Sequence, residues 1–419
     1  MRKKKRENRR WLIFRRRKER AQRNNTVSET TEVQEAVPER AAGEAREAEK
    51  GSVRMDVRFA VASADFAVNM LKELYDGSDN VLVSPLSVET ALLMAANGAK
   101  GSTLEEFRKL FGGEMSFEEL RAAASDYIKN LPSTEKAKFH LANAVFIEQS
   151  LTVKDEFIAK NRELYGAEVC QIPFNQAAVT AMNTWVEKHT DGMIDRIIEE
   201  VDPANMLYLI NALSFDGEWK KIYDTASVRN TQFTCENGQR TSVTGLYSVE
   251  DFYLINDVCD GFVKPYADGK YSFAAFLPKK GTGITDFLSK FDGKTLLLLP
   301  ASAKQTEVNA MIPKFTVNYG KMLSAPLMKL GLSTALGTGA DFSGISDVAV
   351  GIDEVIHKTT LTLDERGTKA GAVTAVMLKA LSLPIERPEV ILDRPFVYEI
   401  IDNSTLLPVF VGICVKPEV

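Results

Sequence analysis

Hydrophobic and polar positions follow helical spacing in the first half of the chain and strand-like spacing in the second half. Within residues 59–75 apolar side chains recur every three or four positions, which predicts an amphipathic helix. Residues 87–98 are rich in Ala, Leu and Met and predict a buried helix, and residues 182–200 predict another amphipathic helix. Residues 139–153 predict a strand and a turn, followed by a helix through Tyr165, and a short helix is expected at residues 323–331.

Strand-like apolar runs dominate the rest of the sequence. They are a short buried run at residues 81–85, four later runs and most of the last 65 residues, the four being 206–215, 262–265, 271–277 and 304–315. The helices precede most of the strands without regular alternation, which predicts an α+β fold with long antiparallel sheets. No repeat or linker interrupts residues 58–419, so we expect one domain there.

The first 57 residues have a different composition. Residues 1–20 contain twelve Lys or Arg and two Glu, and residues 29–50 contain seven Glu. This pattern is typical of a charged, disordered extension, and an electrostatic tether to an acidic polymer or membrane surface is the alternative. The apolar run at residues 11–14 is too short for a secretory signal, and Arg9-Arg10 lacks the apolar stretch of a twin-arginine signal.

Composition excludes several classes of protein. Of the 419 residues, 45% are hydrophobic and 26% charged, as in an ordinary soluble domain. The net charge of −5 argues against a nucleic-acid partner, and no apolar run is long enough for a membrane span. The four cysteines are scattered in apolar contexts, which predicts buried free thiols and no zinc site, the four being Cys170, Cys235, Cys259 and Cys414.

No enzyme motif is present in the sequence. The three histidines, His140, His189 and His357, belong to no H-E-x-x-H motif, and neither a G-x-S-x-G elbow nor a P-loop occurs. The glycine-rich residues 337–340 open no helix and are expected to form an ordinary turn. We therefore expect no catalytic residues, no metal and no cofactor.

Six segments in a fixed order carry a family resemblance. They are residues 80–87, 211–219, 312–315, 341–345, 355–358 and 390–400. They occur in the order of the serpins, a family of serine protease inhibitors, and the chain resembles this family over some 360 residues, from about Phe59 to Val419. The resemblance implies the serpin fold, with a large mixed or antiparallel central sheet, further sheets, eight or nine helices and an exposed reactive-centre loop.

The resemblance also implies two clusters along the central sheet. The shutter cluster would lie beneath the point where the sheet opens, and its members are Ser84, Ser87, Asn211 and His357. Such a polar cluster could exchange hydrogen bonds as two strands separate. The breach cluster would lie where the loop first enters the sheet, and its members are Trp219, Lys314 and Glu365. The pairing of Lys314 with Glu365 would hold the loop root.

The reactive-centre loop is expected over about residues 365–388. Read as a strand, one face is small or apolar and free of charge, and consists of Thr368, Ala370, Ala372, Thr374, Val376 and Leu378. The opposite face includes Lys369 and Val373 and can remain in water. The segment can therefore become a new central strand, with its hinge at Glu365, Arg366, Gly367, Thr368, Lys369, Ala370, Gly371 and Ala372. Gly367 would permit the backbone angles of the loop root.

The scissile bond follows from the spacing usual in the family. Counting forward from Gly367 gives Leu381-Ser382, and counting backward from the following segment gives Pro384. We follow the forward count, because the number of loop residues that insert into the sheet determines the position to which the attached protease is carried. Leu381 implies a chymotrypsin-, elastase- or cathepsin G-like target, whereas cleavage at Lys379 or Arg387 would imply a trypsin-like one.

The expected function is inhibition of serine proteases by a monomer that forms a covalent acyl-enzyme complex. Two alternatives keep the fold: a non-inhibitory carrier or chaperone, and an inhibitor of papain-like cysteine proteases. Lys129, Lys136 and Lys138 are too sparse to predict a polyanion site. Because serpins are commonly exported, the resemblance implies an extracellular or cell-surface location. A cytoplasmic location is the alternative.

Overall fold

The computed structural model describes residues 55–352, 354–368 and 386–418. The chain divides into two units, residues 1–50 and residues 51–419, and only the second contains described residues. The charged extension lies outside the described residues, and its character stays a prediction. So does the domain boundary at residue 58, although the first described helix begins at Val57.

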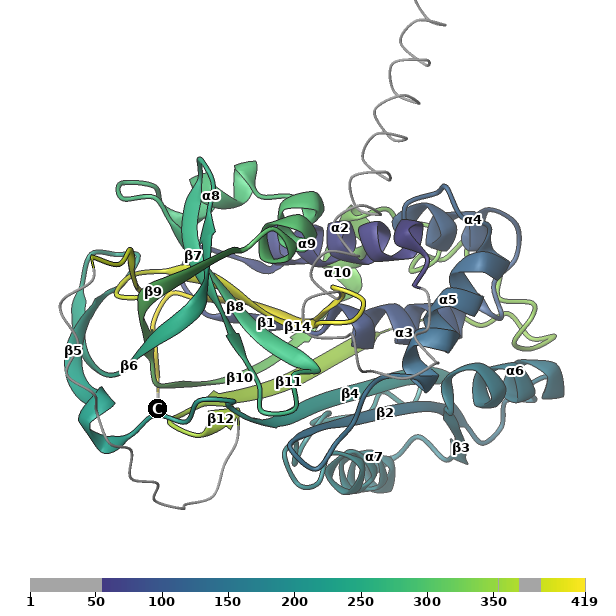
Figure 1. Cartoon of the computed structure of the whole chain (residues 1–419). Helices are drawn as coiled ribbons and strands as arrows, with labels where there is room; N and C mark the ends of the chain where they lie inside the picture. The colour runs from purple at the N-terminus through teal and green to yellow at the C-terminus, as the bar shows by residue number, and fades with distance from the viewer. Residues whose placement is uncertain (1–54, 353, 369–385, 419) are drawn as a thin grey trace, which may run out of the picture. The chain divides into compact units, whose positions relative to one another are not determined.

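Helices form where local capping agrees with apolar spacing (Figure 1). Ser84 caps the helix α3 by accepting a hydrogen bond from the Ser87 N–H, and Pro85 occupies its first turn. Ser116 and Glu119 form a reciprocal capping box at the start of α5. The helices are α2 (Val57–Leu74), α3 (Pro85–Ala96), α4 (Gly101–Leu110), α5 (Phe117–Lys129), α6 (Asp155–Tyr165), α7 (Gln176–His189), α8 (Ile284–Lys290), α9 (Gly293–Ala301) and α10 (Ser324–Lys329), with a short 3₁₀ turn at Thr225–Ser227.

Two sheets contain the described strands. The larger has the order β1-β15-β14-β8-β7-β6-β9-β13, with β5 paired to β6, and the smaller has the order β10-β11-β12-β4-β2-β3. Long antiparallel ladders and the segregation of helices from strands confirm the predicted α+β class. The strands are β1 (Val81–Val83), β2 (Ala137–Glu148), β3 (Glu168–Ile172), β4 (Leu207–Glu218), β5 (Val228–Thr234), β6 (Arg240–Ile255), β7 (Cys259–Pro265), β8 (Tyr271–Pro278), β9 (Lys304–Pro313), β10 (Phe315–Met322), β11 (Val355–Leu363), β12 (Gly367–Thr368), β13 (Glu389–Ile391), β14 (Phe396–Asp402) and β15 (Pro408–Cys414).

The smaller sheet is covered on both faces, and Figure 1 shows α7 and α3 on opposite sides of β2 and β4. On the α7 side, Met182 and Val186 pack with alternate residues of the two strands, including Phe146 and Ile210. The residues between them, among them Asn143 and Asn211, point to the α3 side. The strand period therefore directs these polar side chains towards the start of α3.

Several sequence predictions need correction. The helix predicted at residues 182–200 is α7, which begins earlier and ends at His189. Its end follows from Thr190, whose hydroxyl bonds the Val186 carbonyl, and from the left-handed backbone at Asp191 and Gly192. All four cysteines are free, but Cys170 and Cys235 are only partly buried, because β3 is an edge strand and Cys235 lies in a turn after β5.

Candidate functional site

Four predicted polar residues lie together on the α3 side of the smaller sheet. The Ser84 N–H donates to Nε2 of His357 at 3.2 Å, and the Ser87 N–H donates to Oγ of Ser84 at 3.2 Å. His357 and Asn211 are register partners in the parallel pairing of β11 with β4. The structure therefore brings the members of the shutter cluster together at the junction of these two strands.

His357 is neutral in this site. Its side chain is buried, and burial lowers the pKa of the imidazole to about 3. Because Nε2 accepts the hydrogen bond from Ser84, that nitrogen carries no proton, which agrees with a neutral ring. The imidazole acts here as an acceptor in a hydrogen-bonded core and not as an acid or base.

Two further polar residues belong to this cluster and were not predicted from the sequence. Asn143 of β2 accepts a hydrogen bond from Nδ2 of Asn211 and donates to the Tyr165 carbonyl at 3.2 Å. Thr359 of β11 donates to the Leu82 carbonyl at 2.9 Å. Asn143 interrupts the apolar run 141–147 within β2, and this is the signal that the sequence offers for it.

The seam between β11 and β4 divides this cluster. On the β11 side, His357 and Thr359 bond the backbone around Ser84 and Leu82. On the β4 side, Asn211 bonds Asn143 of β2. In the closed sheet these side-chain bonds run away from the seam. The expected exchange of hydrogen bonds as the two strands part stays a prediction.

The breach cluster surrounds the end of β4 and the root of the loop. Nζ of Lys314 lies 2.9 and 3.1 Å from the carboxylate oxygens of Glu365. Burial, which would raise the pKa of Glu365, is outweighed by the hydrogen bonds and charge of Lys314, so the pKa is lowered. Trp219 donates from Nε1 to the Asp364 carbonyl at 3.0 Å and stacks on Tyr266 with ring centroids 4.5 Å apart.

The root of the loop already forms part of the sheet. Thr368 pairs with Gly217 of β4 on one side and Leu363 of β11 on the other. Its side chain is 1% exposed, and its hydroxyl lies 2.8 Å from the Tyr266 hydroxyl. Below this point β11 and β4 pair directly from Thr360–Ser214 to Val355–Leu209, so the sheet is closed there.

Gly367 is required by a close approach of two backbones. A Cβ at this position would lie 1.8 Å from the Gly217 carbonyl oxygen, much closer than any van der Waals contact. The hinge glycine therefore lets β12 lie against β4, and its φ of +159° agrees with the backbone freedom expected from the sequence.

The rest of the predicted loop lies outside the described residues. This applies to the hinge positions Lys369, Ala370, Gly371 and Ala372 and to the scissile bond Leu381–Ser382. The described chain resumes at Glu386. The next residue, Arg387, is held by Glu307 of β9, with Nε 2.7 Å from the carboxylate.

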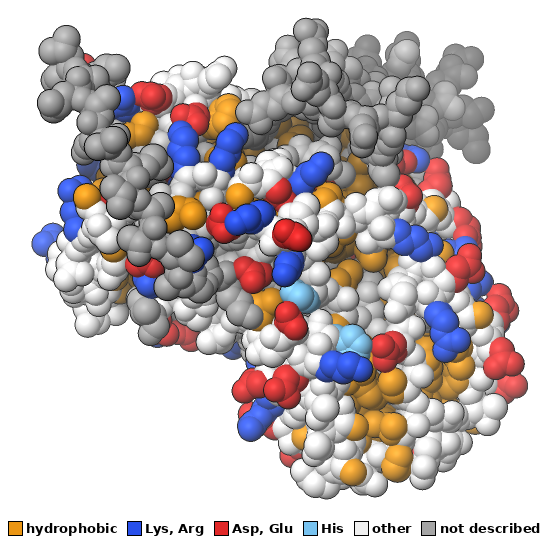
Figure 2. Space-filling model, turned by 60° about the horizontal axis from the view of Figure 1, so that its bottom comes forward, with side chains coloured by type: hydrophobic (Ala, Val, Ile, Leu, Met, Phe, Trp, Pro, Cys, Tyr) orange, Lys and Arg blue, Asp and Glu red, His pale blue; other side chains and the backbone are white. Residues whose placement is uncertain are grey.

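Within the described residues, no cluster of His, Cys, Asp and Glu is arranged to hold a metal ion. No described helix has both the length and the apolar character needed to cross a bilayer. On the face drawn in Figure 2, basic and acidic side chains of the described residues are interspersed. This face therefore lacks the single-signed field that attracts a polyanion.

Comparison with known proteins places this geometry in one family. The family description Serpin (serine protease inhibitor) matches residues 61–417. The leukocyte elastase inhibitor of Sus scrofa is 28% identical over 377 residues, covering 85% of this chain and 98% of the relative.

Two solved structures have the same fold over most of their length. The native state of the thermophilic serpin tengpin is 38% identical with a TM-score of 0.84, covering 88% of this chain and 96% of tengpin. Human thyroxine-binding globulin, solved as a complex with thyroxine, is 26% identical with a TM-score of 0.78, covering 86% of this chain and 99% of that chain. The fold, the ordered sequence segments and the family match over nearly all of residues 58–419 lead to one conclusion: this chain belongs to the serpin family.

Proposed function

We propose that this chain inhibits serine proteases as a suicide substrate, by inserting its severed loop between β11 and β4. The position of Thr368 carries the proposal. Thr368 is the first residue of the uncharged face predicted from the sequence, and its side chain is buried between the two strands that would have to part. The loop would continue an insertion that its root has begun.

The energetic basis is an increase in strand pairing. The closed sheet pairs β11 with β4 over six residue pairs, from Val355–Leu209 to Thr360–Ser214. An inserted strand would pair with both neighbours, and each ladder hydrogen bond contributes about 1 kcal/mol net. The predicted buried face carries no charge, so its burial adds no desolvation penalty. The intact inhibitor would then be a kinetically trapped state.

In this proposal the protease supplies the catalytic groups. The catalytic serine of the protease would attack the carbonyl carbon of Leu381, the peptide bond to Ser382 would break, and an ester would join the two proteins. Hydrolysis of this ester would release an active protease, and insertion would compete with hydrolysis. Inhibition requires that insertion is the faster of the two.

Leu381 favours proteases with an apolar specificity pocket, such as those of the chymotrypsin, elastase and cathepsin G type. Cleavage after Lys379 or Arg387 would select a trypsin-like protease instead. The ion pair of Arg387 with Glu307 supports Leu381, because a protease would have to break that pair to bind the guanidinium. The assignment of Leu381–Ser382 as the reactive bond is part of the proposal.

The test is incubation of the full chain with chymotrypsin, elastase and trypsin. We expect a covalent complex that survives denaturing electrophoresis with one of the first two, with cleavage after Leu381 identified by mass spectrometry. The loop-cleaved chain should also melt at a higher temperature than the intact chain. Cleaved chain with fully active protease, or no gain in melting temperature, would refute inhibition.

A matched pair of variants tests the mechanism. Thr374→Arg places a charge on the face predicted to become buried on insertion, where its desolvation would cost several kcal/mol, and should raise the amount of inhibitor consumed per protease about tenfold or more. Val373→Arg adds the same charge to the face predicted to remain in water and should leave this ratio nearly unchanged. Equal effects of the two would contradict the predicted alternation.

Two other functions would give different results. A non-inhibitory carrier, of the kind that the name of thyroxine-binding globulin describes for that protein, would form no complex and would not be stabilised by cleavage. A cross-class inhibitor would trap papain-like cysteine proteases in the same assay. The monomeric state and an extracellular or cell-surface location, with a cytoplasmic location as the alternative, stay predictions.

A further inference from the structure

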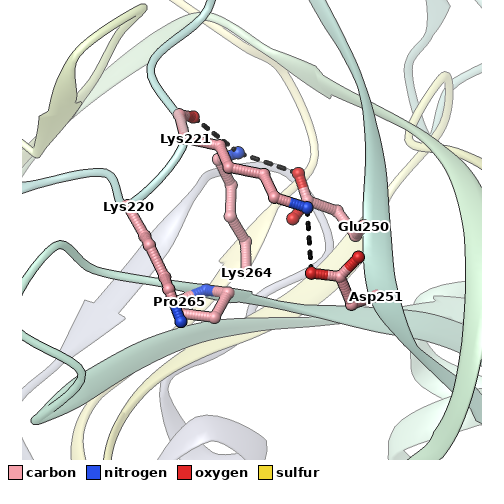
Figure 3. Close-up of a pocket in the computed structure, with 6 residues that line it drawn as sticks. All are labelled: Lys220, Lys221, Glu250, Asp251, Lys264 and Pro265. Carbon is pink, nitrogen blue, oxygen red and sulfur yellow. Dashed lines mark hydrogen bonds and ion pairs between the residues drawn. The ribbon is translucent and has the colours of Figure 1, made fainter.

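A fully buried ion pair lies beside the breach cluster and has no part in the mechanism described so far. Nζ of Lys264 in β7 is 2.8 Å from Oε1 of Glu250 in β6, and the two side chains are 1% and 2% exposed. The same ammonium donates to the Lys221 carbonyl at 3.2 Å (Figure 3). Removing two charges from water costs about as much as their attraction returns, so stability alone is a poor explanation for this pair.

The ammonium group of Lys264 lies near two aromatic rings. Its Nζ lies 4.4 Å from the ring centroid of Tyr223 and 5.3 Å from that of Trp219. Both distances are within the range of attractive cation–π contacts. Together with the bond to the Lys221 carbonyl, these contacts connect Lys264 to three residues of the segment 219–223, which follows β4.

The same segment holds the root of the loop. The Trp219 N–H donates to the Arg366 carbonyl at 2.7 Å, and the Tyr223 N–H donates to the Glu365 carbonyl at 2.9 Å. Tyr266, two residues after Lys264 in the chain, bonds the Thr368 hydroxyl. Lys264 thus lies behind two backbone contacts that hold the loop root beside the end of β4, in addition to the direct pairing of β12 with β4.

We propose that Lys264, held in place by Glu250, is a positioning residue for loop insertion. It fixes segment 219–223 so that the loop root stays docked in the register that the severed loop must follow. This inference rests on the proposed inhibitory function. When Lys264 is lost, the loop root leaves its docked position more often, so insertion begins from a broader set of positions. A larger fraction of the acyl-enzyme is then hydrolysed before the loop is inserted.

The experiment separates positioning from stability. In Lys264→Met, Glu250 is left as a buried unpaired carboxylate, so a loss of stability is expected whatever the role of Lys264. In Lys264→Met/Glu250→Met both charges are removed, and apolar replacement of a buried pair is often neutral or stabilising. Lys279→Met is the matched control, because Lys279 pairs with Asp260 at the opposite end of the β7–β8 ladder.

Two quantities are measured on the full chain. Hydrogen exchange of the Trp219 and Tyr223 amides should rise about threefold or more in the double variant, which loses both cation–π contacts and the bond to the Lys221 carbonyl. The amount of inhibitor consumed per protease should rise by a similar factor, with the melting temperature unchanged. Lys279→Met should leave the exchange and the ratio at wild-type values.

The outcomes that overturn the proposal are distinct from those that overturn inhibition. If the double variant has wild-type exchange at the Trp219 and Tyr223 amides and consumes the wild-type amount of inhibitor per protease, Lys264 does not position the root. A fall in melting temperature with equally faster exchange in β14 and β15 would indicate a general structural role, which also refutes it. If the wild-type chain forms no covalent complex, inhibition fails, while amide exchange still decides whether Lys264 holds the root.

Discussion

Glu89 is a buried carboxyl group on α3, and we predict that it makes the protein less stable as the pH rises. The side chain is 2% exposed, and its Oε2 accepts a hydrogen bond of 3.0 Å from Ser63 of α2. Within the described part of the chain, its Oε1 has no hydrogen-bond partner. Burial raises the pKa of Glu89 from 4.5 to about 8, because the charged form would lose its hydration.

The sign and size follow from proton linkage. Between pH 4.5 and 8 the folded chain keeps the Glu89 proton that the unfolded chain has lost. The free energy of unfolding therefore falls by about 1.4 kcal/mol per pH unit, or about 5 kcal/mol over the whole window. The favourable contribution is complete below pH 4.5 and absent above about pH 8. His357 has the opposite effect in acid, because its lowered pKa costs stability as the pH falls below 6.5.

The assay compares Glu89→Gln with the wild-type chain at pH 6 and pH 8.5, so that contributions common to both proteins cancel. The substituted amide stays neutral at both pH values. From pH 6 to pH 8.5 the free energy of unfolding of the variant should therefore rise by about 3 kcal/mol relative to that of the wild type. For a folded unit of this size this corresponds to about 3–4 °C in melting temperature. All melts use one scan rate, since unfolding of a trapped state is governed by its rate.

Glu187→Gln is the matched control, because Glu187 lies on the exposed side of α7 and the substitution changes the charge equally. Its melting temperature should differ from that of the wild type by the same amount at both pH values. If the gap between Glu89→Gln and the wild type is also independent of pH, the carboxyl group does not stay protonated in the folded chain and the reasoning is wrong.

Three further substitutions test the loop root and the shutter cluster. Gly367→Ala must displace β12 from Gly217 and should cost about 1–3 kcal/mol, read from melting and faster proteolysis of the loop; an unchanged melt would contradict the close approach. Glu365→Gln breaks the pair with Lys314, but both side chains are about one third exposed, so we expect a loss below about 1 kcal/mol that shrinks in high salt. Asn143→Ala removes the acceptor of the Asn211 amide and should cost about 1–3 kcal/mol in a denaturant melt, whereas wild-type stability would exclude its structural role.

Features encoded by local pattern could be predicted from the sequence. The helix α2 follows its apolar spacing, and its predicted range, 59–75, agrees with Val57–Leu74 to within two residues. The run at residues 206–215 corresponds to β4, because a strand buried on both faces reads as a continuous apolar segment. Both predictions depend on neighbours within a few residues.

Features that depend on distant partners could not be predicted. Lys264 is the single charge in the short apolar run 262–265, and its burial depends on Glu250, which reaches it from another strand. Asn143 stands in an apolar run, and its role depends on Asn211, 68 residues later. The helix α7 was placed too late, because a hydroxyl and a left-handed turn end it before its apolar pattern stops.

The number of loop residues that lie in the sheet of the intact chain could not be predicted, because the same sequence pattern fits any number. Alternating small and apolar residues would suit an inserted strand that ends at Thr368 or at any later residue of the same face. In the described part of the chain, β12 lies between β11 and β4 at Thr368, and β11 and β4 pair directly from Thr360–Ser214 to Val355–Leu209. Under the proposed function, further insertion would have to separate the six paired positions of β11 and β4 and the packing around them. On that mechanism the barrier would lie in backbone pairing and in the docking of the loop root, which is where the variants of Lys264 and Gly367 act.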